Sequence, residues 1–155
     1  MDRGGLIQAD VHEGIESTLT ILGHKLRDAG IRVERQYDRT LPPLTMYGSE
    51  LNQVWTNLLD NAIDAAGRAG RITITTAADN GMLRVDIADS GPGVPAGFQD
   101  RVFDPFFTTK QVGHGTGLGL GTSRRIVQDR HGGRLAFDSD SEGTVFHAWL
   151  PLTQG

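Results

Sequence analysis

Apolar residues recur at helical spacing in the first part of the chain. Residues 9–31 begin with Asp10 and Glu13 at the spacing of a capping box and end at Gly30, a residue type that often stops a helix. Between these signals the apolar positions repeat every three or four residues, at Val11, Ile15, Leu19, Leu22 and Leu26. The pattern predicts one amphipathic helix.

Two more helices are expected further along. One covers residues 50–67, with Ser49 as its cap and Gly67 near its end. The other covers residues 120–133, where two glycines stop it. Residues 39–49 contain two prolines, which forbid a helix and predict a connection.

Short apolar and β-branched runs predict five strands. The strands are expected over residues 31–38, 71–78, 82–89, 134–140 and 143–152. The turn Asp79-Asn80-Gly81 joins the second and third of them into a hairpin. Residues 90–116 are rich in Gly, Pro and Phe and are expected to be irregular, apart from a short helix after Pro95.

This order of elements predicts an α/β fold. Helices would pack on one face of a mixed, mostly antiparallel sheet, which is a two-layer α/β sandwich. We expect one domain over residues 10–152, an N-terminal tail over residues 1–9 and a C-terminal tail over residues 153–155. A chain of 155 residues is long enough to bury a core of its own.

Composition narrows the class of protein. The net charge is −4 and the basic residues are scattered, so nothing predicts a nucleic-acid partner. Cysteine is absent, which excludes disulfides and thiolate metal sites. No apolar run is long enough to span a membrane, and the N-terminus lacks the apolar core of a signal peptide. We therefore expect a cytoplasmic domain without direct membrane contact, which could be part of a larger sensor protein.

Three polar residues share one face of the second predicted helix. Asn57, Asn61 and Asp64 follow i, i+4, i+7 spacing. Such a trio can be an ordinary solvated face. It can also be an amide pair that holds Mg²⁺, because one protein oxygen and substrate phosphates are enough for that ion.

Asp89 ends a predicted strand and is followed by two glycines in the sequence DSGPGV. These residues are all turn formers, so a tight turn is one interpretation. The alternative is a purine pocket in which the Asp89 carboxylate accepts from an exocyclic amine. Gly91 and Gly93 would then allow another group to approach the backbone.

Five alternating glycines occupy the segment GHGTGLGLG, residues 113–121, which runs into the start of the third helix. It can be a linker, a phosphate cradle or a loop that moves. The spacing matches neither the dinucleotide fingerprint nor the P-loop, but the free N–H groups of a helix start favour anions. The preceding FDPFFTTK offers phenylalanines, as core or as anchors of a mobile segment, and Lys110 as a charge suited to phosphate.

Four stretches in this order resemble the boxes of one known family. They are NQVWTNLLDNAIDAA, DSGPG, FDPFFTTK and GTGLGL, and the closing strand GTVFHAWLP also matches. Together they resemble the ATP-binding catalytic domain of two-component sensor histidine kinases, in the superfamily that holds DNA gyrase, Hsp90 and MutL. The resemblance implies the Bergerat-type ATP-binding fold, with ATP between the asparagine helix and a glycine-rich lid.

The resemblance also assigns roles to single residues. It implies that Asn61 is the Mg²⁺ ligand, that Asn57 lies near the phosphates and that Asp89 reads the adenine amine. Asn57, Asn61 and Lys110 would be the catalytic residues. The nucleotide-binding set would be Asn57, Asn61, Asp64, Asp89, Gly91, Gly93, Lys110, Gly113, Gly115, Thr116, Gly117, Leu118, Gly119 and Leu120.

Asn57 indicates which reaction to expect. The resemblance extends to gyrase-like ATPases, which carry a glutamate at the position of Asn57. That glutamate activates water. An amide cannot accept a proton at neutral pH, so transfer to a protein acceptor is favoured over hydrolysis. We expect the chain to bind Mg-ATP and to pass the γ-phosphoryl group to a histidine on a separate dimerisation domain, with a response regulator downstream.

The acceptor histidine is expected outside this chain. Family acceptors are His-Glu or His-Asp followed soon by proline, whereas His12-Glu13 lacks the proline and lies in a capping box. His24, on the same predicted helix, is no better a candidate. The isolated chain should therefore bind ATP but label itself poorly. Two alternatives stay open: a serine kinase of the anti-sigma type, and a nucleotide-sensing module without transfer activity.

Overall fold

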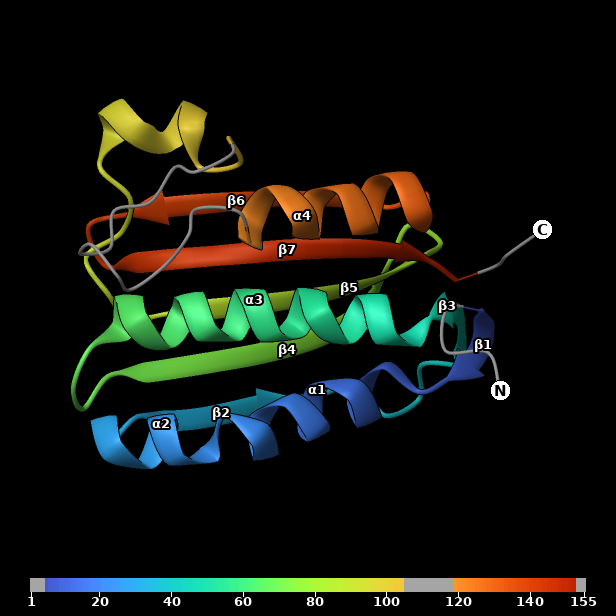
Figure 1. The fold of residues 1–155 in the computed structure, drawn as a ribbon, viewed down its shortest axis with the longest axis horizontal. Coiled ribbons are helices and arrows are strands. Elements are labelled where there is room, and N and C mark those ends of the chain that lie inside the picture. The colour runs from blue at the N-terminus through green and yellow to red at the C-terminus, as the bar shows by residue number, and fades with distance from the viewer. Residues whose placement is uncertain (1–4, 105–118, 153–155) are drawn as a thin grey trace.

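A computed structural model describes residues 5–104 and 119–152 of the chain (Figure 1). The helices are α1 (Val11–Ile21), α2 (Gly23–Ala29), α3 (Gly48–Ala66), the 3-10 helix η1 (Ala96–Arg101), α4 (Gly119–Arg125) and the π-helical turn η2 (Ile126–Arg130). The strands are β1 (Leu6–Ala9), β2 (Arg32–Gln36), β3 (Leu44–Tyr47), β4 (Arg71–Asp79), β5 (Met82–Asp89), β6 (Arg134–Asp140) and β7 (Gly143–Pro151).

Five strands form the main sheet, in the order β2-β4-β5-β7-β6. Only β2 and β4 pair in parallel, and the other three pairings are antiparallel. Helices α1, α3 and α4 lie side by side over one face of this sheet, with α3 in the middle (Figure 1). The predicted two-layer α/β sandwich is confirmed.

The core lies between α3 and the inner face of the sheet. Side chains alternate along each strand, so every second residue of β5 is buried, from Leu83 through Val85 and Ile87 to Asp89. The face of α3 that meets them is fully apolar, at Leu51, Val54, Trp55, Leu58, Leu59, Ala62 and Ile63. Because Asp89 continues the buried row, its carboxylate enters the helical side of the sheet.

Two local predictions hold well. The hairpin between β4 and β5 turns through Asn80 and Gly81, whose positive φ angles of 53° and 79° match the type I′ turn expected of Asn-Gly. Helix α3 ends before Gly67, as the glycine predicted. Both features depend on local backbone chemistry alone.

The single helix predicted over residues 9–31 is wrong, because it divides at Leu22 into α1 and α2. The Thr18 and Thr20 hydroxyls donate to the carbonyls of Gly14 and Glu16, four residues earlier. Hydroxyls that bond back in this way bend helices, and Gly23 has low helix propensity. The break follows directly after this turn.

Two short strands were missed. Leu6–Ala9, which we placed in an N-terminal tail, pairs as β1 with β3. Strand β3 lies inside the predicted connection 39–49, just after its two prolines. Each strand is four residues long, which is too short to show a clear alternating pattern. The two strands are therefore recognised from their pairing with each other.

Helix ends also differ from the prediction. Helix α3 starts at Gly48 after Tyr47, so Ser49 lies inside the first turn instead of capping it. The helix expected over residues 120–133 starts at Gly119 as α4 and passes into the π-helical η2. Within the described residues, no helix has the length and apolarity to cross a bilayer.

Candidate functional site

Asp89 stands at the end of β5 with its side chain largely buried, at 9% exposure. Its Oδ1 accepts a hydrogen bond from the Gly91 N–H at 2.9 Å, and the Thr144 N–H also donates to the carboxylate. Burial raises the pKa of Asp89, and these two backbone hydrogen bonds offset part of that rise. The result is a desolvated carboxylate that can accept from a polar ligand.

The two glycines after Asp89 are required by close approaches within the protein. A Cβ on Gly91 would lie 2.2 Å from the Ala65 carbonyl oxygen at the end of α3. A Cβ on Gly93, whose φ is +83°, would lie 1.9 Å from the Asp140 carbonyl oxygen. The groups that approach these glycines in the structure are protein backbone, and their contact with a nucleotide stays a prediction.

Asn57 links α3 to the start of α4. Its Nδ2 donates to the Gly119 carbonyl oxygen at 3.1 Å and to the Ser123 hydroxyl at 3.2 Å. A Cβ on Gly119 would lie 3.3 Å from the Asn57 Cγ, so glycine allows this approach. Leu120, the next residue, packs against the main core, and its predicted contact with the nucleotide stays a prediction.

Asn61 lies between these two ends. It is half-buried, one turn beyond Asn57 and one turn before Ala65. From Asn57 to Ala65 the helix rises about 12 Å. This face of α3 therefore connects Gly119 at one end with Gly91 and Asp89 at the other.

Asp64 behaves differently from the two asparagines. Its carboxylate lies 3.6 Å from the Nζ of Lys25 on α2, and Lys25 also pairs with Asp60. The hydrogen bond to Asp60 is the main cause that raises the pKa of Lys25. We did not predict this lysine, although acidic residues at i and i+4 of a helix are a signal for a basic partner. A role of Asp64 in nucleotide binding stays a prediction.

Six predicted site residues lie outside the described residues: Lys110, Gly113, Gly115, Thr116, Gly117 and Leu118. Of the phenylalanine box, Phe103 is described. Its ring packs edge-on against Phe137 and Phe146, with centroids 5.9 Å and 6.3 Å away. The interpretation as core packing fits this residue.

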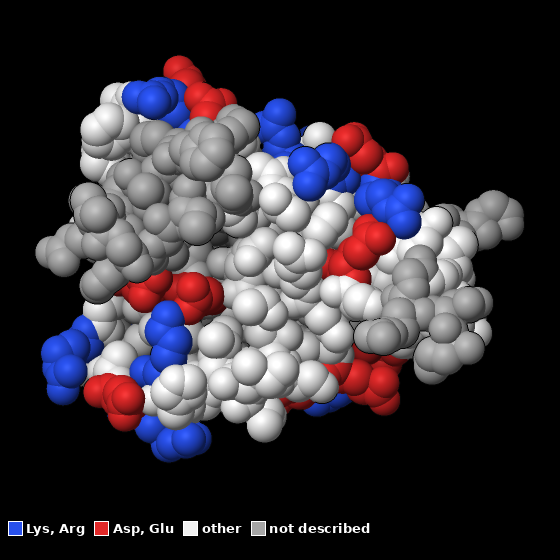
Figure 2. Space-filling view, in the orientation of Figure 1, with Lys and Arg blue, Asp and Glu red and all other residues white. Residues whose placement is uncertain are grey.

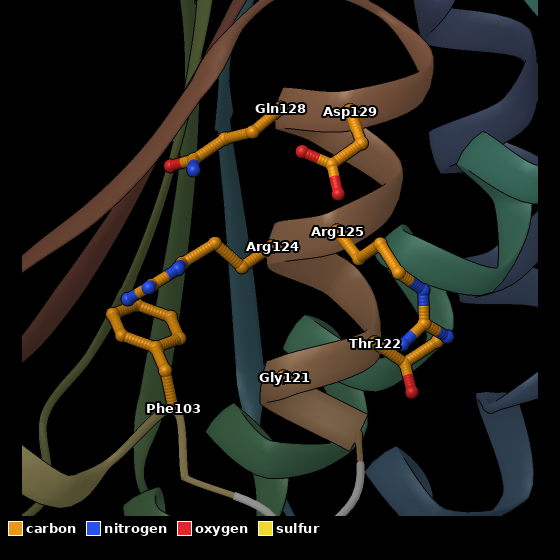
Figure 3. A pocket seen from close by; sticks show the side chains of 7 residues that line it. All are labelled: Phe103, Gly121, Thr122, Arg124, Arg125, Gln128 and Asp129. Carbon is orange, nitrogen blue, oxygen red and sulfur yellow. The ribbon is translucent and has the colours of Figure 1, made fainter.

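A pocket of about 340 Å³ lies along α4 and η2 beside Phe103 (Figure 3). Its lining comprises Phe103, Gly121, Thr122, Arg124, Arg125, Gln128 and Asp129. The Arg124 guanidinium lies 4.9 Å from the centre of the Phe103 ring. Among the described residues, none of the nucleotide-binding residues expected from the sequence lines this pocket.

The donor set fits a magnesium ion held mainly by its ligand. In residues 5–104 and 119–152 no three His, Asp or Glu side chains gather as a metal cage. The amide oxygens of Asn57 and Asn61 are hard donors on the same face, and Mg²⁺ needs few protein ligands when phosphates and waters complete its shell.

The candidate acceptor His12 is a structural residue. It is 2% exposed, its Nδ1 contacts the Asp10 Oδ1 at 2.7 Å and its Nε2 contacts the Thr76 hydroxyl at 2.9 Å. His24 is exposed on α2.

The helical face in Figure 2 shows basic and acidic groups interspersed around a largely uncharged centre, as the scattered charges predicted.

Comparison with known proteins gives the following relationships. Residues 47–154 match the family described as Histidine kinase-, DNA gyrase B-, and HSP90-like ATPase. The chain is 34% identical over 144 residues to the sensor histidine kinase ZraS of Escherichia coli (strain K12), covering 92% of this chain and 30% of ZraS. It therefore spans less than a third of that relative.

Solved structures are similar over almost the whole chain. The nucleotide-free catalytic domain of the histidine kinase ThkA superposes with a TM-score of 0.87 at 33% identity, covering 99% of this chain and 97% of that one. ThkA in complex with the response regulator protein TrrA superposes with a TM-score of 0.82 at 30% identity, covering 96% of this chain and 42% of that one.

Proposed function

The chain belongs to the histidine kinase-, DNA gyrase B- and HSP90-like ATPase family, and we propose that it binds Mg-ATP and supplies the γ-phosphoryl group to a histidine on a separate acceptor domain. The histidine kinases among its relatives support a histidine acceptor over the serine acceptor of an anti-sigma-type kinase. A response regulator would receive the group next, as the partner of ThkA suggests.

The observation that carries this proposal is the line of polar groups along α3. Asp89 marks one end of the line, Asn61 the middle, and Asn57 with Gly119 the other end. No described basic side chain pairs with the Asp89 carboxylate, and such a carboxylate suits an amine donor such as the adenine amino group. Amide groups and backbone suit the phosphates, so the two ends differ in chemistry as the two ends of ATP do.

The residues near the phosphate end would position the phosphates and would not activate a water molecule. Asn57 has no proton-accepting group at neutral pH, so it cannot serve as a general base for water. Asn61 would hold Mg²⁺ through its amide oxygen, and the ion would neutralise charge on the phosphates when bound. Phosphoryl transfer needs little more than such positioning, which favours a protein acceptor brought in from outside.

Calorimetric titration with Mg-ATP tests the nucleotide part. We expect binding by the wild-type chain and loss of at least about tenfold in affinity for Asn61→Ala, since a charge-assisted contact is lost. Asn52→Ala, an exposed asparagine on the same helix, is the matched control and should bind normally. Equal affinity in all three proteins would contradict the site.

Labelling with γ-phosphate-labelled ATP tests the transfer part. The isolated chain should label itself poorly, and a longer protein that carries an acceptor histidine should gain acid-labile phosphate. Acid-stable phosphate on a serine would instead support the serine kinase. ATP binding without labelling of any acceptor would support a nucleotide-sensing module.

A further inference from the structure

Ser123 is a polar side chain on α4 with no exposure to solvent. Its Oγ lies 3.2 Å from the Nδ2 of Asn57, which is 66 residues earlier in the chain. The same nitrogen lies 3.1 Å from the Gly119 carbonyl oxygen. Ser123 was not among the residues expected from the sequence, because nothing local distinguishes it from any other helical serine.

These two contacts determine how the Asn57 amide is oriented. A side-chain amide has two N–H hydrogens and one oxygen, and a backbone carbonyl can only accept. Turning the amide over would place its oxygen against the Gly119 carbonyl oxygen, which is repulsive. Gly119 therefore selects the orientation, and Ser123 accepts the second hydrogen.

In this orientation the Asn57 Nδ2, and not its Oδ1, faces the Gly119 carbonyl oxygen and the Ser123 hydroxyl, while Oδ1 lies 3.5 Å from the position of a Cβ on Gly119. No described residue donates a hydrogen bond to this oxygen, so among the described residues it is an unused acceptor. A group with a free acceptor of this kind suits a metal-bound water or another donor at the phosphate end.

We propose that Ser123 is a positioning residue that holds the Asn57 amide so that its Oδ1 faces the phosphate end of the site. The inference rests on the proposed function for what binds there, but the hydrogen bond itself does not. Without the hydroxyl, one amide hydrogen is left in a buried place without an acceptor. The amide then gains freedom to rotate, and its oxygen is held less well.

The variants Ser123→Ala and Ser123→Thr test this proposal, with Thr122→Ala as the matched control. Thr122 is the adjacent hydroxyl on α4, and it lines the pocket beside Phe103. We expect Ser123→Ala to weaken Mg-ATP binding about 5- to 10-fold, and much less when Mg²⁺ is chelated. Ser123→Thr should restore most of the affinity, and Thr122→Ala should change nothing.

A double-mutant cycle separates positioning from a general effect on the fold. In an Asn57→Ala background, Ser123→Ala should cause no further loss of ATP affinity, because its only route to the ligand has been removed. Additive losses would overturn the proposal. So would an unchanged affinity of Ser123→Ala when Asn57→Ala is impaired.

A readout without nucleotide keeps the two proposals distinguishable. NMR of the Asn57 side-chain amide, assigned by its loss in Asn57→Ala, should show faster hydrogen exchange in Ser123→Ala than in the wild type. Unchanged exchange would overturn the positioning role even if ATP binds. If the wild type fails to bind ATP, the proposed function fails, and the role of Ser123 in binding fails with it.

Discussion

Asp86 and Asp89 lie three residues apart on β5 and face opposite sides of the sheet. On the outer face, Asp86 contacts the Arg84 guanidinium at 3.0 Å and the His147 ring at 2.6 Å. On the inner face, and among the described residues, Asp89 accepts from backbone N–H groups alone and forms no ion pair with a basic side chain. Arg84 and His147 already partner the outer carboxylate, whereas the inner one is the carboxylate that we propose meets the ligand.

The pKa values express the same contrast between the two faces. The Trp149 indole N–H and the Arg84 guanidinium donate to Asp79, also on the outer face, and hold its pKa below the ordinary value. Burial raises the pKa of Asp89 instead. Asp79 therefore adds stability that is present above its unfolded pKa and lost as pH falls through its folded pKa. Asp89 instead adds stability that is present below its unfolded pKa and lost as pH rises through its folded pKa. The reason is that the folded state binds the proton of Asp89 more tightly than the unfolded state does.

Removing the charge of Asp89 should give the largest effect. Asp89→Asn should lower ATP affinity roughly 10- to 100-fold, because a hydrogen bond to a charged acceptor is lost. The free energy of unfolding should change by no more than about 1 to 3 kcal/mol, since no cation is left unpaired but one of the two backbone N–H donors can lose its acceptor. Titration calorimetry and urea unfolding measure the two quantities. A normal affinity would show that the inner carboxylate is structural after all.

Gly91→Ala tests whether the close approach of Asp89's loop to α3 matters. The added Cβ would force apart the loop and the Ala65 carbonyl, and we expect a loss of about 2 kcal/mol in the free energy of unfolding. Gly97→Ala is the control, because a Cβ there meets nothing within 4 Å. If both variants unfold at the same urea concentration, the close contact between Gly91 and the Ala65 carbonyl does not limit the residue at position 91, and the prediction is wrong.

Acidification should separate the two faces by function. If only ionised Asp89 accepts the ligand's amine, ATP affinity should fall by up to about tenfold per pH unit below its raised pKa. The fall should begin at a higher pH than an ordinary aspartate would allow. The residual affinity of Asp89→Asn should lack this component. If ATP affinity depends on pH in the same way in the wild type and in Asp89→Asn, the ionised Asp89 carboxylate does not bind the ligand's amine.

The smallest effect is expected from Asp86. Asp86→Asn should reduce the free energy of unfolding by about 1 kcal/mol, because Arg84 and His147 lose a partly buried partner, and it should leave ATP affinity unchanged. Asp28→Asn, an exposed aspartate on α2, is the control for charge alone. A change in ATP affinity for Asp86→Asn would contradict the proposal that only the carboxylate on the inner face takes part in binding.

Local signals predicted much of the fold and where several candidate site residues lie in it. Gly67 predicted where α3 ends, and Asn80-Gly81 predicted the hairpin that brings β5 beside β4. The spacing of Asn57 and Asn61 placed both on one face of a helix. Strands β1 and β3 escaped prediction because four residues carry too little pattern. The division of the first helix at Leu22 depends on threonine side chains that bond back to the helix.

The sequence by itself determined which residues can do the chemistry, because side-chain type and helical or strand periodicity are local properties. Only the tertiary structure decided which of them meet. It brought Gly119 to Asn57 across 62 residues, set Gly91 against Ala65 and paired Asp64 with Lys25. It also added Ser123, a residue no motif marked. Such contacts arise from the packing of α3, α4 and β5 on one another, and packing depends on the shape of the whole core, which no short stretch of sequence contains.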